Sequence, residues 1–291
     1  MAQRLATSSL PACARLLNKS GNVARAYLKH SVLRARSSRA GSTRAVFEPY
    51  IASRDFEMAV ITTNDLIAEH VKGLSFVDIG GLWGTNNERV TVALTHQAKS
   101  ATMMDIVPMG HELWRKFDQR AKEAGFAGQY KSISANLDDP DLTRNHGTFD
   151  FVHCSGIIYH APSPFHTLMS LRALTRKYLV LGSMTVPEKI STASGQIDMS
   201  DGAAYFIPAL SRDKLAIFKE HFDALDVKVH NINTAETHKW LASPGMPNYG
   251  PWWWLWTPDT LARMAETAGF KLIGIFPGWK DRAHGIFLEA A

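Results

Sequence analysis

Short apolar runs alternate with stretches of helical spacing from Thr63 to the end of the chain, and this alternation limits the fold more than any other feature. Continuously apolar strands that are separated by helices form a parallel sheet with both faces covered. The last two runs are joined by too few residues for a crossover helix, so we expect them to be antiparallel. The sequence therefore predicts an α/β domain with a doubly wound, mostly parallel sheet of seven strands, an antiparallel last strand and helices on both faces. The predicted strands are Ser75–Ile79, Ala101–Ile106, Tyr130–Ser134, Phe149–Cys154, Tyr178–Leu181, Lys271–Phe276 and His284–Leu288.

Polar residues mark where the intervening helices begin. Thr63 or Asn64 can cap the first helix, and Thr85 with Glu88 has the spacing of a capping box that opens the second. The alternation lapses over residues 187–250, apart from one helix that starts near Ser211. We interpret residues 187–250 as a cap inserted into the domain.

Charge divides the chain into two parts. The whole sequence carries 32 Lys and Arg against 27 Asp and Glu, a net charge of +5. Residues 1–47 hold nine of the basic residues and no acidic one, so residues 48–291 carry 23 basic and 27 acidic groups, a net charge of −4. A mildly acidic globular part does not favour a nucleic-acid partner. We expect a basic leader or N-terminal helix at 1–47 and one domain at 48–291.

The leader has three interpretations. Its arginines and serines and its lack of acids fit a mitochondrial transit peptide. Its apolar residues also fit a short cationic amphipathic helix, and residues 37–42 fit a disordered segment. We favour the helix or disorder, and expect a cytoplasmic protein, with a mitochondrial location as the alternative.

Cysteine and histidine spacing predicts no metal. Cys13 and Cys154 are the only cysteines and lie far apart, which excludes a disulfide framework or a CxxC zinc site. His153, His160 and His166 lack a convincing metal-ligand spacing. No apolar run is long enough for a transmembrane segment.

A glycine cluster follows the first strand, at the sheet edge where open α/β sheets bind ligands. A dinucleotide fingerprint that starts at Gly80 would need glycines where the chain has Leu82 and Thr85, so an NAD site fails on spacing. A P-loop fails as well, because no Gly-Lys-Ser/Thr follows. Small residues and free amides at a helix start remain, and these suit an anionic group such as a carboxylate. A tight strand-to-helix turn without a ligand is the alternative.

Further polar residues follow the second and third strands. Asp105 ends the second strand, 27 residues after Asp78, where a carboxylate can accept hydrogen bonds from both hydroxyls of a ribose. Asn136 and the backbone of Leu137 can hold an adenine ring after the third strand. Alone, each residue also fits an ordinary solvated strand end or loop.

Together these residues resemble class I S-adenosylmethionine-dependent methyltransferases over roughly 63–291. The family motif D/E-x-G-x-G-x-G is matched at Asp78, Gly80 and Gly84 and departs at Leu82, and the family's ribose acid falls on Asp105. The antiparallel strands at the end of the chain match the family as well. The resemblance implies S-adenosylmethionine as cofactor, bound by Asp78, Gly80, Gly81, Gly84, Asp105, Ile106, Asn136, Leu137 and Ser155.

A narrower resemblance lies in Phe149–Val152 with Ser155–His160, and in Asn248–Trp254. It is similar to the methyltransferase branch related to the tRNA wobble-uridine carboxymethyltransferases, whose fourth strand runs FDxVxxxGxLYH. We take the reaction type from this resemblance, and not the tRNA substrate.

Two side chains at the end of the fourth strand are the candidates for catalysis. Methyl transfer to oxygen or nitrogen needs a nearby proton acceptor, and the ordinary histidine pKa near 6.5 suits His160 to that role. A histidine that caps the following helix is the alternative. We expect Tyr159 to pack against the cofactor rather than to react.

Four of the eight tryptophans lie within five positions before the last helix. This aromatic cluster predicts one wall of an acceptor pocket, formed by Trp252, Trp253 and Trp254 together with Trp83. At least two of the clustered rings are expected to be plain core. A stacking platform for nucleobases is the alternative, although the globular part has no basic stripe beside it.

The sequence thus predicts methyl transfer from S-adenosylmethionine to an oxygen or nitrogen of a small-molecule acceptor. A tRNA-modifying (carboxy)methyltransferase and a catalytically silent cofactor-binding module are the alternatives. The oligomeric state stays open.

Overall fold

The residues that the computed structural model describes are 61–83, 88–227, 252–279 and 282–291, all within one compact unit, Met58–Ala291. Their centre is a seven-stranded sheet of order β10-β11-β5-β4-β1-β2-β3. Strands β1 to β5 are parallel, and β11 is antiparallel to both of its neighbours. The predicted doubly wound sheet with an antiparallel last strand is therefore confirmed. Its strands are β1 Ser75–Ile79, β2 Ser100–Asp105, β3 Lys131–Ser134, β4 Phe149–Ser155, β5 Thr175–Met184, β10 Phe270–Pro277 and β11 Ala283–Ala290.

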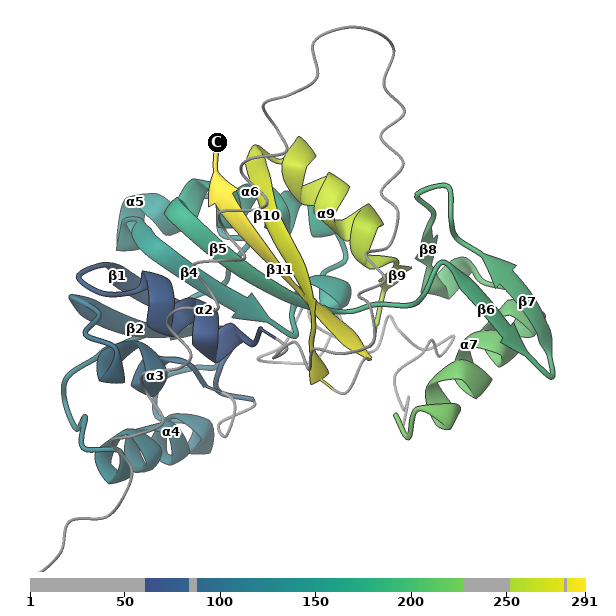
Figure 1. Cartoon of the computed structure of the whole chain (residues 1–291). Helices are drawn as coiled ribbons and strands as arrows, with labels where there is room; N and C mark the ends of the chain where they lie inside the picture. The colour runs from purple at the N-terminus through teal and green to yellow at the C-terminus, as the bar shows by residue number, and fades with distance from the viewer. Residues whose placement is uncertain (1–60, 84–87, 228–251, 280–281) are drawn as a thin grey trace, which may run out of the picture. The chain divides into compact units, whose positions relative to one another are not determined.

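Helices cover both faces of this sheet (Figure 1). Successive strand residues point to opposite faces, so Val77 and Ile79 pack in one buried cluster while Phe76 packs in the other. One cluster includes α5 Leu142–His146, α6 Pro164–Leu174 and α9 Pro258–Thr267, and the other includes α2 Thr63–His70, α3 Val90–Thr95 and α4 Glu112–Glu123.

The predicted start of the second helix is wrong. Helix α3 begins at Val90, four residues after the first helical position that a Thr85 N-cap implies, and Thr85 lies outside the described residues. The reason is that the buried Glu88 carboxylate has other partners: it accepts hydrogen bonds from Thr91 N and from Arg120 Nε of α4, both at 3.0 Å. Glu88 therefore joins α3 to α4 from outside the helix.

The predicted cap contains more regular structure than expected. Its helix α7, Arg212–Ala224, has Ser211 as N-cap, as predicted. The segment before it forms a hairpin and a further short strand, and this strand pairs with β9 Trp254–Trp256, which lies about 50 residues later in the chain. These strands were missed because they are short and one finds its partner so far away. The additional cap elements are β6 Lys189–Thr192, β7 Gly195–Asp198, β8 Ala204–Phe206 and the 3₁₀ helix η4 Ile207–Ala209.

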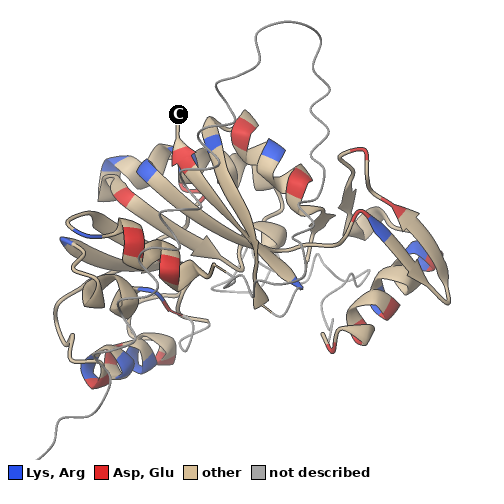
Figure 2. Cartoon of the chain, viewed as in Figure 1, with Lys and Arg blue, Asp and Glu red and all other residues tan. Residues whose placement is uncertain are grey.

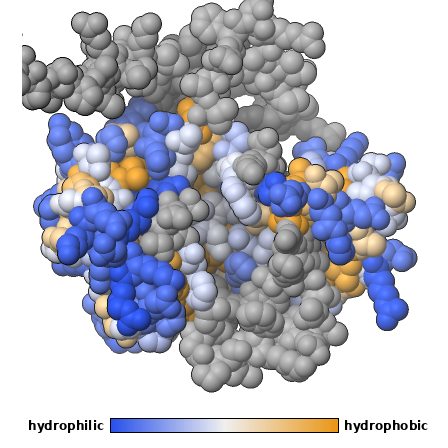
Figure 3. Space-filling view, turned by 90° about the horizontal axis from the view of Figure 1, so that it is seen from below, coloured by the Kyte–Doolittle hydropathy of each residue, from blue (hydrophilic) through white to orange (hydrophobic). Residues whose placement is uncertain are grey.

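The described surface mixes both signs of charge. Acidic and basic residues are interspersed along α4 and α9 (Figure 2). Seen from below, hydrophilic residues cover most of the left-hand part, and apolar residues reach the surface among the cap elements at the right (Figure 3). In the part of the chain that is described, no helix has the length and apolar character to cross a membrane.

Candidate active site

Strands β1, β2 and β4 end at one edge of the sheet and bring the predicted residues together there. Ile79 pairs with Met104 on one side and with Cys154 on the other. Directly after Ile79, the Gly80 N–H donates to the Met104 carbonyl at 2.8 Å. Gly80, Asp105 and Ser155 therefore occupy the ends of three adjacent strands.

Asp105 is the most distinctive group at this edge. The residue is 3% exposed, its Oδ1 accepts a hydrogen bond from Val107 N at 3.1 Å, and its Oδ2 has no hydrogen-bond partner among the described residues. Burial raises the pKa of Asp105 to about 6, although the backbone N–H groups of Val107, Leu82 and Ile106 oppose the shift. A buried carboxylate oxygen without a donor is a site for a ligand that supplies one.

Asp78 has a different environment. It is fully buried, its Oδ1 lies 2.7 Å from His153 Nδ1, and its Oδ2 accepts a hydrogen bond from Arg89 N at 2.7 Å. Both carboxylate oxygens of Asp78 thus contact groups of the protein itself. They fix His153 of β4 and the Arg89 N–H at the start of α3. Sequence reasoning missed His153 as the partner of Asp78; the signal for it is the β1–β4 register, which pairs these two residues.

The glycines after β1 are needed by the packing around them. Gly80 has φ +79°, and a Cβ there would lie 2.3 Å from Ile157 Cδ1. A Cβ at Gly81 would lie 2.4 Å from Asp78 Oδ2. Trp83 is 59% exposed at this turn, and Gly84 lies outside the described residues.

The loop after β3 lies beside Asp105, because Ala135 N donates to the Asp105 carbonyl at 2.9 Å. Asn136 is half-buried, and its Oδ1 accepts a hydrogen bond from Asp138 N at 3.0 Å, which leaves its amide NH₂ group as the polar group to offer a ligand. The Leu137 side chain is core, so Leu137 can offer only its backbone. Ile106 is half-buried.

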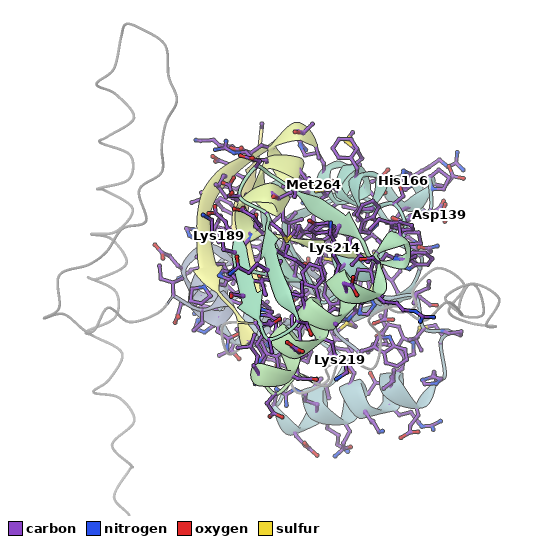
Figure 4. The ribbon with its side chains drawn as sticks, turned by 90° about the vertical axis from the view of Figure 1, so that its right-hand side faces the viewer. Asp139, His166, Lys189, Lys214, Lys219 and Met264 are labelled. Carbon is purple, nitrogen blue, oxygen red and sulfur yellow. The ribbon has the colours of Figure 1, made fainter. Side chains whose placement is uncertain are left out.

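The same loop meets the start of α6. Thr167 Oγ1 donates to Asp138 Oδ1 at 2.9 Å, and His166 Nε2 lies 3.4 Å from the Asp138 carbonyl oxygen. Asp139 and His166 lie near each other at the periphery in Figure 4. These contacts hold the predicted adenine-binding loop against the sheet.

The end of β4 carries the candidate catalytic residues. Ser155 is exposed, and the short 3₁₀ helix η3, Ile158–His160, follows it. The Tyr159 ring lies 4.3 Å from the His160 ring and 5.3 Å from the Trp252 ring, measured between centroids. Burial raises the pKa of Tyr159 to about 12, so its phenol stays protonated at neutral pH. His160 is half-buried, and its N–H donates to the Ile157 carbonyl at 2.8 Å.

The clustered tryptophans divide between core and site edge. Trp252 packs edge-on to Phe222 at 5.2 Å in the cap core, and Trp256 is fully buried in the main core. Trp254 Nε1 donates to the Pro162 carbonyl at 3.2 Å. Trp256 and Trp252 thus confirm that at least two of the rings are core.

Trp253 differs from the other three. Its N–H donates to the Tyr159 carbonyl at 2.9 Å, which places it beside the candidate catalytic residues. Its ring stacks on Phe206 at 6.0 Å, and the residue is 8% exposed. Its indole Nε1 has no hydrogen-bond partner among the described residues. A ligand with an acceptor atom would satisfy this buried donor.

Metal-binding geometry is not found in the described ranges. They contain no group of three or more His, Cys, Asp or Glu side chains that could hold a metal ion. Cys154 is buried in β4, and burial raises the pKa of its thiol, so it packs as a small apolar residue.

Comparison with known proteins identifies the family. A profile described as a methyltransferase domain matches residues 54–274. The chain belongs to this methyltransferase family. The match confirms the predicted S-adenosylmethionine-dependent methyltransferase of the class I fold, whose sheet is described above. No curated protein matches the chain.

Several solved structures are similar to this methyltransferase. The magnesium protoporphyrin IX methyltransferase of Synechocystis PCC 6803, with S-adenosylhomocysteine bound, is 14% identical with a TM-score of 0.45, over 79% of this chain and 82% of that one. An O-methyltransferase family protein of Burkholderia thailandensis is 14% identical with a TM-score of 0.46, over 78% and 55%. A possible exported protein of Bordetella parapertussis is 13% identical with a TM-score of 0.49, over 78% and 65%.

Proposed function

We propose that this methyltransferase transfers the methyl group of S-adenosylmethionine to an oxygen or nitrogen of a small molecule. The observation that carries the proposal is the Asp105 carboxylate, which is buried at the carboxyl end of β2 with an oxygen that receives no hydrogen bond from the described residues. The two hydroxyls of a ribose would supply donors to it. Asn136 and the Leu137 backbone lie in the loop bonded to Asp105, at the position for the adenine.

The cofactor supplies an electrophilic methyl group on a positively charged sulfur. The residues of the chain then orient the acceptor and receive its proton. His160 is the proposed base, because it lies at the end of β4 with its ring against Tyr159. Tyr159 stays protonated and acts as a packing wall, and the Trp253 indole N–H would donate to the acceptor.

The finer assignments are part of the same proposal. The segment Phe149–His160 supports membership of the branch related to the wobble-uridine carboxymethyltransferases. The mixed charges of the described surface favour a small acceptor over tRNA (Figure 2). We propose a cytoplasmic location; the leader on which the mitochondrial alternative depends lies outside the described residues.

Calorimetry with S-adenosylhomocysteine tests the cofactor site in the full-length protein. We expect the product to bind, and Asp105→Ala to weaken binding at least tenfold, since hydrogen bonds to a charged group are worth about 1.5–3 kcal/mol. Asp201→Ala, at an exposed position of the cap, is the control and should bind as the wild type does. Equal binding by the Asp105 variant would contradict the assignment.

Release of S-adenosylhomocysteine across a metabolite panel then tests the reaction. We expect turnover with at least one hydroxyl or amine acceptor and a large loss with His160→Ala. Cofactor binding without turnover on any acceptor would favour the silent binding module instead.

A further inference from the structure

Arg282 lies at the acceptor end of the sheet edge. It directly precedes β11, whose Ala283 pairs with Met184, the last residue of β5. Gly285 of β11 pairs with Gly182, and Gly182 pairs with Ser155 at the end of β4. Two strand spacings, about 10 Å, therefore separate Ser155 from β11 along the edge that holds the catalytic candidates.

The Arg282 side chain is buried and has few partners. The residue is 8% exposed, its Nη1 donates to the Asp226 carbonyl at 3.1 Å, and its guanidinium lies 5.4 Å from the centre of the Trp279 ring. No carboxylate pairs with it among the described residues. Within the described ranges, its charge is balanced by a carbonyl just past the end of α7 and by an aromatic face.

Lysines of the cap are exposed and contact a carboxylate or an aromatic ring. Three of them, labelled in Figure 4, come from β6 and α7. Lys189 Nζ lies 3.7 Å from Asp198, Lys219 pairs with Asp223, and Lys214 lies over the Tyr205 ring. The paired lysines are exposed, with side chains 75% and 67% accessible. Arg282 alone of these four cations is buried.

Arg282 Nε and Nη2 are not among the buried polar atoms of the described residues that lack a partner, so these groups are accessible to a ligand. Arginine does not lose its proton in proteins, so burial cannot neutralise it. A helix C-terminus offsets only part of a full positive charge. The planar fork of N–H groups fits the two oxygens of a carboxylate, and the hydrogen bond from Nη1 to Asp226 leaves the other N–H groups of Arg282 for them.

We propose, on the basis of the proposed function, that Arg282 binds a carboxylate of the methyl acceptor. Ala283, which follows Arg282, packs against the cap cluster that contains Met184, and the half-buried Tyr159 packs against the same cluster. The groups near Arg282 are thus apolar or aromatic, which suits an acceptor with an aromatic body. Among the described residues no second cation contacts Arg282, and a single positive charge matches a carboxylate better than a phosphate. The acceptor class is therefore an aromatic carboxylic acid.

Benzoate and benzamide are the probes, because they share shape and differ in charge. Each is titrated by calorimetry into full-length protein saturated with S-adenosylhomocysteine. We expect benzoate to bind at least tenfold more tightly than benzamide. Arg282→Gln should remove this preference, and Arg282→Lys should keep part of it because the charge remains without the fork. Lys219→Gln, an exposed ion-paired position of the cap, is the control and should keep the full preference.

The outcomes separate this inference from the proposed function. Binding of S-adenosylhomocysteine to the wild type tests the cofactor site by itself, and Arg282→Gln should leave it unchanged. If benzoate and benzamide bind equally, or neither binds, Arg282 is no carboxylate site. If Arg282→Gln lowers the unfolding temperature but keeps the preference for benzoate, Arg282 only fastens α7 to the sheet, and the inference is overturned.

Discussion

The ionised Asp105 carboxylate should lower the stability of the unliganded protein and raise its affinity for the cofactor. The variant Asp105→Asn separates these two effects. The raised folded-state pKa means that the ionised carboxylate is disfavoured by folding. Its unfavourable contribution is absent below the ordinary pKa of 3.8, grows as the pH rises, and is complete above about 6. The difference between the folded and the ordinary pKa of Asp105 lowers the free energy of unfolding by at most about 3 kcal/mol at neutral pH, since relaxation of the site reduces the effect.

The asparagine variant keeps the shape of the side chain and removes its charge. We therefore expect Asp105→Asn to stabilise the unliganded protein at pH 7 by about 1–3 kcal/mol. The gain should shrink as the pH falls from 7 and should vanish below the ordinary pKa of 3.8, where Asp105 of the wild type is protonated in both states. Urea unfolding at pH 7 and at pH 5, without cofactor, measures it.

Cofactor affinity should change in the opposite direction. The ribose hydroxyls need the ionised carboxylate as acceptor, so the affinity of the wild type for S-adenosylhomocysteine should fall about tenfold between pH 7 and pH 5. Asp105→Asn should bind more weakly at pH 7, and its affinity should change little over the same range. Calorimetry at both pH values tests this, with Asp201→Asn as the control. An Asp105→Asn variant that is no more stable and has the pH dependence of the wild type would refute the reasoning.

Two further predictions concern buried or partly buried carboxylates. His153→Leu should lower the free energy of unfolding by about 3 kcal/mol, because Asp78 loses a buried partner, and adding Asp78→Asn should recover part of the loss in urea unfolding. Little loss, or no recovery in the double variant, would contradict this pairing. Asp150→Asn should cost about 1–2 kcal/mol at pH 7, since hydrogen bonds from an arginine and from Ser75 hold the pKa of Asp150 below its ordinary value. The stabilisation by Asp150 is complete above the ordinary pKa of 3.8 and is lost as the pH falls through the lower folded pKa. If the stability lost in Asp150→Asn stays constant down to pH 2, the argument is wrong.

The sequence predicts that the candidate cofactor residues lie at one sheet edge, because the signals for that placement are local. The predicted ends of β1 and β3, at Ile79 and Ser134, are those of the structure, and Asp105 follows the apolar run of β2 directly. The Asp78–His153 contact is different, because it joins residues 75 positions apart through the register of β1 with β4. No pattern within either strand indicates that register.

The acceptor half depends on long-range packing throughout. β9 forms by pairing with β8, far earlier in the chain, and this pairing places Trp253 between Tyr159 and Ile207. In the sequence, Arg282 has the pattern of an ordinary turn arginine near Trp279. Its contact with the Asp226 carbonyl, just past the end of α7, joins residues distant in sequence. These residues have no local signal, since their environment comes from segments distant in sequence.

Two buried acids at one sheet edge therefore have separable roles. Asp78 is the acid of the family motif, yet its oxygens are bonded to His153 and to the Arg89 backbone. Asp105 has one oxygen without a donor among the described residues, and the nearby Asp78 charge contributes to its raised pKa. The motif acid thus shapes the turn and adds to the electrostatic cost of ionising its neighbour. A ligand that donates to Asp105 would relieve that cost, so we expect Asp105 to be the acid that couples cofactor binding to stability.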